Sequence, residues 1–168
     1  MPHWISFVTA LGPMHLAWTA SGIFFLHFGE GPGPDASDSQ EAPGWVLDAM
    51  RRLLSHLAGH PQDLSTIPMD LSGRTPFQRQ VMDILKSTRP GQTLSYGDLA
   101  LLAGRPGAAR AVGQAVKANP ILILVPCHRV VAAHGPGGWS AFGTPERKAR
   151  LLELETLHTE PHAAPAPR

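Results

Sequence analysis

The hydrophobic pattern changes its period about halfway along this 168-residue chain, and that change is the strongest constraint on its fold. In the first 28 residues, apolar and polar side chains alternate loosely in three short runs, which is typical of strands. From Thr75 onward the apolar positions recur every three or four residues, which is typical of helices. The sequence therefore predicts an N-terminal part with a small sheet and a mainly helical C-terminal part.

The N-terminal part is expected to contain three antiparallel strands and one helix. Residues 29–44 are rich in Gly, Pro, Asp and Ser and are expected to form a mobile loop. Prolines and turn residues place a linker within 60–74. The strands are predicted over 4–8, 15–18 and 23–28, and the helix over 45–57.

The first C-terminal helix has a clear start and a clear end in the sequence. Thr75 is a suitable N-cap for a helix that begins with Pro76, a favoured first position for proline. Arg89 precedes another proline, so the helix is expected to end there. Its buried stripe is predicted to consist of Phe77, Val81, Ile84 and Leu85.

Two further helices follow with the outline of a helix-turn-helix. Ser95 and Asp98 form a capping box that opens a helix through Ala103. A second helix is expected over 108–118, where small residues cover much of the surface and Arg110 is the one long side chain near the start. Such a smooth helix suits either a DNA groove or close packing inside the fold, and the residues alone leave both interpretations open.

The charge is distributed unevenly, although the net charge is only +1. Residues 1–73 carry two basic and seven acidic side chains, whereas residues 74–155 carry eleven basic and five acidic ones. The C-terminal part is therefore the part suited to a polyanion such as nucleic acid, with ordinary surface variation as the alternative.

Composition argues against several classes of protein. No apolar run approaches the roughly 20 residues that a membrane span needs, and the N-terminus lacks the pattern of a secretory signal. We therefore expect a cytoplasmic protein with no membrane partner. The single cysteine excludes an internal disulfide and argues against a cysteine-rich zinc site. The nine histidines show no metal-ligand spacing, so no metal site is expected, with a histidine-based site as the alternative.

An apolar run over 121–125 precedes the lone cysteine, Cys127, which lies in the sequence Pro-Cys-His-Arg. A free cysteine is often only a small buried side chain. Here a proline breaks any regular strand before it, and the adjacent His128 and Arg129 can carry positive charge, which favours the nucleophilic thiolate. Because adjacent side chains point in different directions, a water is expected to relay the proton from Cys127 to His128.

A histidine that acts as a base needs a carboxylate to orient it, and Glu155 is the candidate. A helix beginning at 144–145 places Glu155 on one face with Lys148, Leu151 and Leu152. That face predicts partial burial, where a carboxylate requires a partner. An exposed helix end is the alternative.

Six short motifs, in this order, resemble those of the O6-alkylguanine-DNA alkyltransferase family, also called methylated-DNA–protein-cysteine methyltransferases. The resemblance covers residues 73–157, and its cysteine motif is highly specific. The motifs are Thr-Pro-Phe-Gln at 75–78, Ser-Tyr-Gly-Asp-Leu-Ala at 95–100, Ala-Arg-Ala-Val-Gly at 109–113, Asn-Pro at 119–120, Val-Pro-Cys-His-Arg-Val at 125–130 and the helix over 148–155.

The resemblance implies two domains followed by a tail. Residues 1–72 would form an α/β N-terminal domain of ribonuclease H-like topology. Residues 73–157 would form a mainly α C-terminal domain with a winged helix-turn-helix, which binds DNA and accepts the alkyl group. Residues 158–168, rich in Pro, Ala and His, are expected to be a disordered tail.

The activity implied by the resemblance is DNA repair by direct damage reversal. A methyl or other alkyl group passes irreversibly from O6 of guanine in double-stranded DNA to Cys127 after base flipping. O4-alkylthymine is a further candidate substrate. The protein would act once, as a monomer and without a cofactor, because the thioether is stable. His128 is implied as the water-mediated base, Glu155 as its partner and Asn119 as the residue that holds the turn before Cys127.

The resemblance also assigns DNA contacts and a pocket. Arg110 would fill the gap left by the extruded nucleotide, Tyr96 would turn that nucleotide out, and Ser95 would contact the backbone. The recognition helix, with Ala109 and Gly113 on its DNA side, would enter the minor groove. The alkyl and base pocket would contain Val130, Trp139 and Ser140.

Some residues depart from the family pattern, and other functions are conceivable. Trp139 stands where tyrosine is usual, and 141–142 hold Ala-Phe in place of two glycines, so the range of accepted alkyl groups is open. An alkyltransferase-like protein, which binds alkylguanine DNA without transfer, lacks the acceptor that Cys127 supplies. A transcription factor would need more base-reading side chains in the second helix. A Cys–His hydrolase would leave the basic C-terminal part unexplained.

Overall fold

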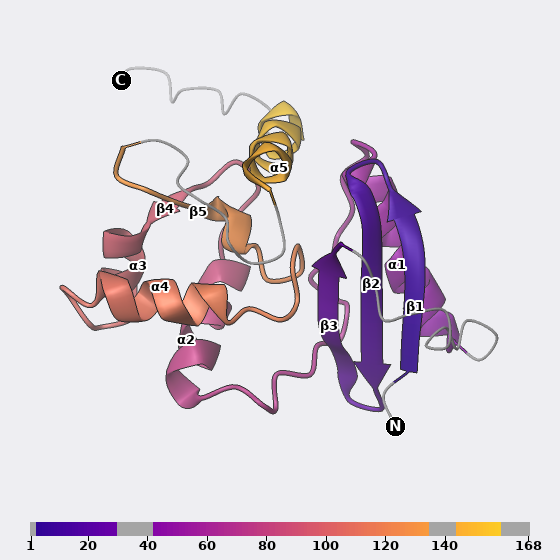
Figure 1. Ribbon diagram of the computed structural model, residues 1–168, viewed down its shortest axis with the longest axis horizontal. Helices are drawn as coiled ribbons and strands as arrows, with labels where there is room; N and C mark the ends of the chain where they lie inside the picture. The colour runs from indigo at the N-terminus through magenta and orange to yellow at the C-terminus, as the bar shows by residue number, and fades with distance from the viewer. Residues whose placement is uncertain (1–2, 30–41, 135–143, 159–168) are drawn as a thin grey trace, which may run out of the picture.

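The N-terminal part of the molecule is a small sheet covered by one helix. The structure, a computed structural model, describes residues 3–29, 42–134 and 144–158. Its sheet is antiparallel in the order β1-β2-β3, and α1 lies against one face (Figure 1). These elements are β1 (His3–Thr9), β2 (Gly12–Thr19), β3 (Gly22–Phe28) and α1 (Gly44–Leu57). The predicted strands and helix are confirmed, and most of the predicted loop over 29–44 lies outside the described residues.

The linker over 60–74 is attached to the sheet. The Ile23 amide at the start of β3 donates to the Pro68 carbonyl at 2.9 Å, and the Asp70 amide donates to the Ile23 carbonyl at 2.8 Å. Gly22 has a φ of 144°, and a Cβ there would lie 2.7 Å from the backbone of Pro68. Only glycine therefore permits this close approach between the hairpin and the linker.

The C-terminal part is built mainly from helices, which gather beside β3 in Figure 1. Both predicted N-caps are present as capping boxes, one between Thr75 and Gln78 and one between Ser95 and Asp98. The elements are α2 (Pro76–Lys86), β4 (Leu94–Ser95), α3 (Tyr96–Leu102), α4 (Ala109–Lys117), the 3-10 helix η3 (Cys127–Arg129), β5 (Val130–Val131) and α5 (Pro145–His158).

Helix α2 ends three residues before the predicted position at Arg89. The hydroxyls of Ser87 and Thr88 donate to the carbonyls of Ile84 and Leu85, and this closes the last turn early. Within the predicted stripe, two residues are fully buried and two are half-buried, while the neighbouring Met82 is also fully buried. The fully buried pair is Val81 and Leu85, and the half-buried pair is Phe77 and Ile84.

Strand β3 also connects the two parts of the molecule. The Leu26 amide donates to the Pro120 carbonyl at 2.9 Å, and the Leu122 amide donates to the Leu26 carbonyl at 2.8 Å. The chain that leads to Cys127 therefore runs as a parallel neighbour of β3, and one continuous hydrophobic core extends through both parts. Within the described ranges, no helix is both long enough and apolar enough to cross a membrane.

His27, beside this connection, links stability to pH. Its ring is 4% exposed and stacks on Phe25 with centroids 4.1 Å apart. Burial lowers the pKa of His27 from 6.5 to about 4, although backbone hydrogen bonds with Asn119 and Pro120 oppose the shift. Between these two pH values the unfolded chain binds a proton that the folded chain does not. The free energy of unfolding therefore falls as the pH falls through this window, by up to about 3 kcal/mol.

We expect the urea midpoint to fall between pH 7 and pH 4.5, and His27→Gln to remove much of that fall. The matched control is His60→Gln, since His60 is exposed. Parallel pH dependence in the native protein and His27→Gln would contradict this account.

Candidate active site

A tight turn carries the chain from helix α4 to the cysteine. Residues 121–125, the apolar run before the cysteine, are all buried. The Leu124 amide donates to the Leu122 carbonyl at 2.8 Å, and the Val125 amide donates to the Ile121 carbonyl at 3.0 Å. Ile123, between them, has a φ of 71°, which is strained for a β-branched residue. Such a turn persists only if its surroundings hold it.

Asn119 supplies that restraint. Its Nδ2 donates to the Val125 carbonyl at 2.9 Å, and its Oδ1 accepts from the Ile121 amide at 3.0 Å. The side chain is 2% exposed and follows the last turn of α4. Asn119 therefore spans the turn: it satisfies the buried amide of Ile121 and gives the Val125 carbonyl a second donor.

Cys127 begins the 3-10 helix η3, where the chain changes direction after Pro126 as predicted. Its side chain is 1% exposed, and its thiol forms no disulfide. The Cys127 amide donates to the Val125 carbonyl at 2.8 Å, so the cysteine backbone is tied to the end of the turn that Asn119 holds.

His128 and Glu155 form the predicted pair. His128 Nε2 lies 2.7 Å from Glu155 Oε1, and the two side chains are 1% and 3% exposed. Burial by itself would raise the pKa of Glu155, but hydrogen bonds and positive charge from His128 and Arg129 outweigh it and lower the pKa to about 2. An ionised carboxylate only accepts, so Nε2 donates and Nδ1 of the neutral ring is the basic atom. Nδ1 is buried and bonds to no described residue, Cys127 included.

Arg129 does not occupy the position expected for a cation that acts on the thiol. Its Nε and Nη2 donate to Glu155 at distances of 2.8–3.2 Å, and its Nη1 donates to the carbonyl and hydroxyl oxygens of Thr88 at 2.7 and 2.9 Å. The guanidinium is thus committed to the carboxylate and to the segment after α2.

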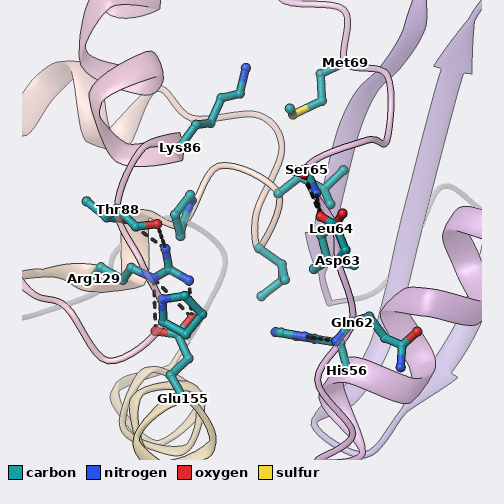
Figure 2. Close-up of a pocket in the computed structure, with 14 residues that line it drawn as sticks. His56, Gln62, Asp63, Leu64, Ser65, Met69, Lys86, Thr88, Arg129 and Glu155 are labelled. Carbon is teal, nitrogen blue, oxygen red and sulfur yellow. Dashed lines mark hydrogen bonds and ion pairs between the residues drawn. The ribbon is translucent and has the colours of Figure 1, made fainter. Parts of the chain in front are cut away.

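These residues also border a cleft between the two parts of the molecule. Figure 2 shows Thr88, Arg129 and Glu155 along one wall of this cleft of about 260 Å³, opposite a wall from the N-terminal part. The opposite wall contains His56, Gln62, Asp63, Leu64 and Ser65. The Arg129–Glu155 pair therefore lies at the junction of the two parts.

Lys148 is a functional candidate that the sequence analysis did not assign. It is 1% exposed, and its Nζ donates to the Val130 carbonyl at 2.7 Å. Burial lowers the pKa of Lys148, while negative charge on Cys127 opposes the shift. Within the described residues no carboxylate pairs with it, so the Cys127 thiolate is the anion it can balance. The spacing that predicted burial of Glu155 also applies to Lys148, and this was the available signal.

Tyr96 faces the same region from the start of α3. The parallel pairing of β4 with β5 places Ser95 opposite Val131 and brings the start of α3 to the strand that follows the cysteine. Burial, and secondarily the charge of Cys127, raises the pKa of Tyr96 above its ordinary value. Its hydroxyl therefore stays protonated and can donate. A Cβ on Gly113 would lie 3.7 Å from the Tyr96 ring, so the ring packs against α4.

Helix α4 has one packed face and one exposed face. Val112 and Val116 are buried, whereas Arg110 and Gln114 are exposed, and Ala109 is partly exposed. Close packing inside the fold thus accounts for only one side of this helix, and its other side is accessible to a partner.

The structure brings together six of the expected site residues and leaves two without a description. Trp139 and Ser140 lie outside the described residues. No group of three or more metal-ligating side chains occurs in the described ranges. The residues assembled around the cysteine are Tyr96, Asn119, Cys127, His128, Val130 and Glu155.

Comparison with known proteins identifies the family. Residues 76–157 match the profile of the 6-O-methylguanine DNA methyltransferase DNA-binding domain. A methylated-DNA–protein-cysteine methyltransferase of Mycobacterium tuberculosis strain H37Rv is 39% identical over 156 residues, which cover 92% of this chain and 93% of that protein. The chain belongs to the methylated-DNA–protein-cysteine methyltransferase family.

Other relatives match over a shorter length. The enzyme of this name from Shigella flexneri is 45% identical over 113 residues, which are 67% of this chain but only 63% of the relative. Among solved structures, the Mycobacterium tuberculosis O6-methylguanine methyltransferase has a TM-score of 0.80 at 36% identity, covering 96% of both chains. The Mycobacterium tuberculosis OGT protein in complex with DNA has a TM-score of 0.78 at 36% identity, covering 92% of this chain and 93% of its own.

We expect Asn119→Ala to lower the free energy of unfolding by about 1–3 kcal/mol, because the substitution leaves the buried Ile121 amide without its partner and removes one of the two donors to the Val125 carbonyl. Urea denaturation followed by circular dichroism measures this change. Gln114→Ala, on the exposed face of α4, is the control and should change the value by less than about 0.5 kcal/mol. Equal effects of the two substitutions would show that Asn119 does not hold the turn.

Proposed function

We propose that this protein repairs DNA by accepting an alkyl group from O6 of guanine onto Cys127, irreversibly and once per molecule. The observation that carries the proposal is the buried Cys127 beside the His128–Glu155 pair, reached through a turn that begins at helix α4. Membership of the family and the likeness to a relative solved with DNA support it.

The described side chains account for the chemistry of transfer. Nδ1 of His128 takes the thiol proton of Cys127 through a water, and Glu155 stabilises the resulting imidazolium. Lys148 offsets the charge of the thiolate. The sulfur then bonds to the alkyl carbon while the carbon–O6 bond breaks, and its electron pair stays on the guanine. The hydroxyl of Tyr96 donates a hydrogen bond to the leaving base and keeps its proton. The proton that His128 took from the thiol passes through water to the released guanine, and no cofactor takes part.

Helix α4 would contact DNA through its exposed face. Its small residues Ala109 and Gly113 let the backbone approach the minor groove, and Arg110 would occupy the gap left by the extruded nucleotide. Tyr96 would displace that nucleotide, and Ser95 would contact the phosphate backbone. The excess of basic side chains in residues 74–155 supports this orientation toward a polyanion.

We infer the finer fold from the same relatives. The sheet β1–β3 with α1 corresponds to a ribonuclease H-like N-terminal domain over 1–72, and α3 with α4 belongs to a winged helix-turn-helix within 73–157. The predicted tail over 158–168 starts one residue too early, because α5 includes His158, and residues 159–168 lie outside the described ranges. Val130, whose carbonyl accepts from Lys148, would line the alkyl and base pocket together with Trp139 and Ser140. Binding of alkylated DNA without transfer is not favoured, because Cys127 and its proton acceptor are both in place.

We expect the intact protein to gain one methyl group in place of one hydrogen after incubation with duplex DNA that carries a single O6-methylguanine. Peptide mapping should locate the methyl group on Cys127, and Cys127→Ala should gain nothing while it still binds the damaged duplex. Selective binding without a mass change in the native protein would favour a recognition protein, and the absence of both would exclude either function.

We expect Arg110→Ala to slow methyl transfer from duplex DNA by about tenfold or more, because extrusion of the nucleotide loses its support. The reaction of Cys127 with iodoacetamide needs no extrusion and should change by less than about twofold. Arg150→Ala removes an equal charge from the exposed side of α5 and should leave both rates unchanged. A slower iodoacetamide reaction in Arg110→Ala would mean that Arg110 acts on the active site itself.

A further inference from the structure

Arg129 holds a buried guanidinium next to the proposed base, and the transfer chemistry gives it no role. Its Nη2 donates to Glu155 Oε1 at 2.8 Å, and its Nε donates to Oε2 at 3.0 Å. His128 Nε2 lies 2.7 Å from the same Oε1. Arg129 and Glu155 are 8% and 3% exposed, so water screens their interaction little. The place of Oε1, and with it the orientation of the His128 ring, therefore depends on the guanidinium.

Thr88 holds the other end of the guanidinium. Arg129 Nη1 donates to the Thr88 carbonyl at 2.7 Å and to the Thr88 hydroxyl oxygen at 2.9 Å. That hydroxyl in turn donates to the Leu85 carbonyl in the last turn of α2. Figure 2 shows Arg129 bonded on one side to Thr88 and on the other to Glu155. A planar guanidinium engaged at both ends cannot rotate without breaking hydrogen bonds.

We propose that Arg129 is a positioning residue for the alkyl transfer, which acts on Cys127 only through Glu155 and His128, and that Thr88 fixes its orientation. This inference rests on the proposed role of His128 as the base. Two other roles of Arg129 are possible alternatives to this one. In the first, the Arg129 charge acts directly on the thiolate, and in the second, Arg129 only stabilises the packing of α2, η3 and α5.

The charges around Glu155 determine what the loss of Arg129 would do. His128 and Arg129 contact the carboxylate of Glu155. Lys148, which lies on α5 together with Glu155, donates to the Val130 carbonyl. The cleft beside the pair is also lined by His56, Asp63 and Lys86. Without Arg129, the charge of Glu155 acts on His128 alone and stabilises the protonated ring. The base is then available only at higher pH, so the acid limb of the pH–rate profile moves upward.

A double-mutant cycle between Arg129 and Glu155 tests the proposal in the full-length protein. The variants are Arg129→Met, Glu155→Gln and their combination, and the readouts are methyl transfer from duplex DNA and carboxymethylation of Cys127 by iodoacetamide across pH. Two further variants test whether the hydrogen-bond geometry of Arg129 matters. Arg129→Lys keeps the positive charge but loses the planar set of guanidinium donors, and Thr88→Val keeps the side-chain shape but loses the hydroxyl. Arg150→Met is the control, because Arg150 pairs with Glu153 on the exposed side of the same helix.

We expect Arg129→Met to slow both reactions by about tenfold, but by less than about twofold when Glu155 is already glutamine. Arg129→Lys should restore the rate only in part, and Thr88→Val should slow both reactions by about threefold. The acid limb should move to higher pH in Arg129→Met and stay in place in Arg150→Met. Urea unfolding of the combined variant, which removes both charges of the Arg129–Glu155 pair, shows whether the fold is retained.

Three outcomes would overturn the proposal. An equal slowing by Arg129→Met in both backgrounds would mean that Arg129 acts directly on the thiolate. Full rescue by Arg129→Lys would mean that charge alone matters. If Arg129→Met leaves both rates and the pH profile unchanged but lowers the urea midpoint, Arg129 has a purely structural role. If the native protein transfers no methyl group, the proposed function fails separately, because the iodoacetamide reaction still measures the coupling.

Discussion

The two hydrogen bonds of the Asn119 side chain hold the turn on which the rest of the site depends. This turn begins at the end of α4, pairs with β3 through Leu26 and ends at Cys127. It includes Ile123 in a left-handed conformation that costs about 1–2 kcal/mol for such a residue. The helix proposed to contact DNA, the sheet and the nucleophile therefore meet in one restrained segment, and displacement of any one of them disturbs the others.

The charged side chains around the cysteine are arranged for chemistry rather than for stability. Arg129 and His128 share the carboxylate of Glu155, and Lys148 is buried near the sulfur with a single backbone carbonyl as its hydrogen-bond partner within the described residues. Buried charges of this kind are costly, and apolar side chains of similar size often stabilise a fold equally well. Their burial around a nucleophile is consistent with a function that requires the thiolate and a neutral base at the same time.

Much of the fold and part of the site could be predicted because their signals are local. The period of apolar residues located the strands and helices, and the two capping boxes fixed the starts of α2 and α3. Spacing on one helix face also predicted that Glu155 is buried and requires a partner. The end of α2 was placed too late, because the hydroxyls of Ser87 and Thr88 close its last turn and no proline rule anticipates this.

The sequence by itself determined the elements, their caps and the presence of a cysteine, a base and a carboxylate in one half of the chain. Only the tertiary structure decided which atoms meet. Arg129 is adjacent to His128 in sequence, yet its guanidinium is held by Glu155, 26 residues away, and by Thr88, 41 residues away. The physical reason is range: periodicity and capping act within a few residues, whereas hydrogen-bond partners in a core are set by the packing of α2, η3 and α5 against one another.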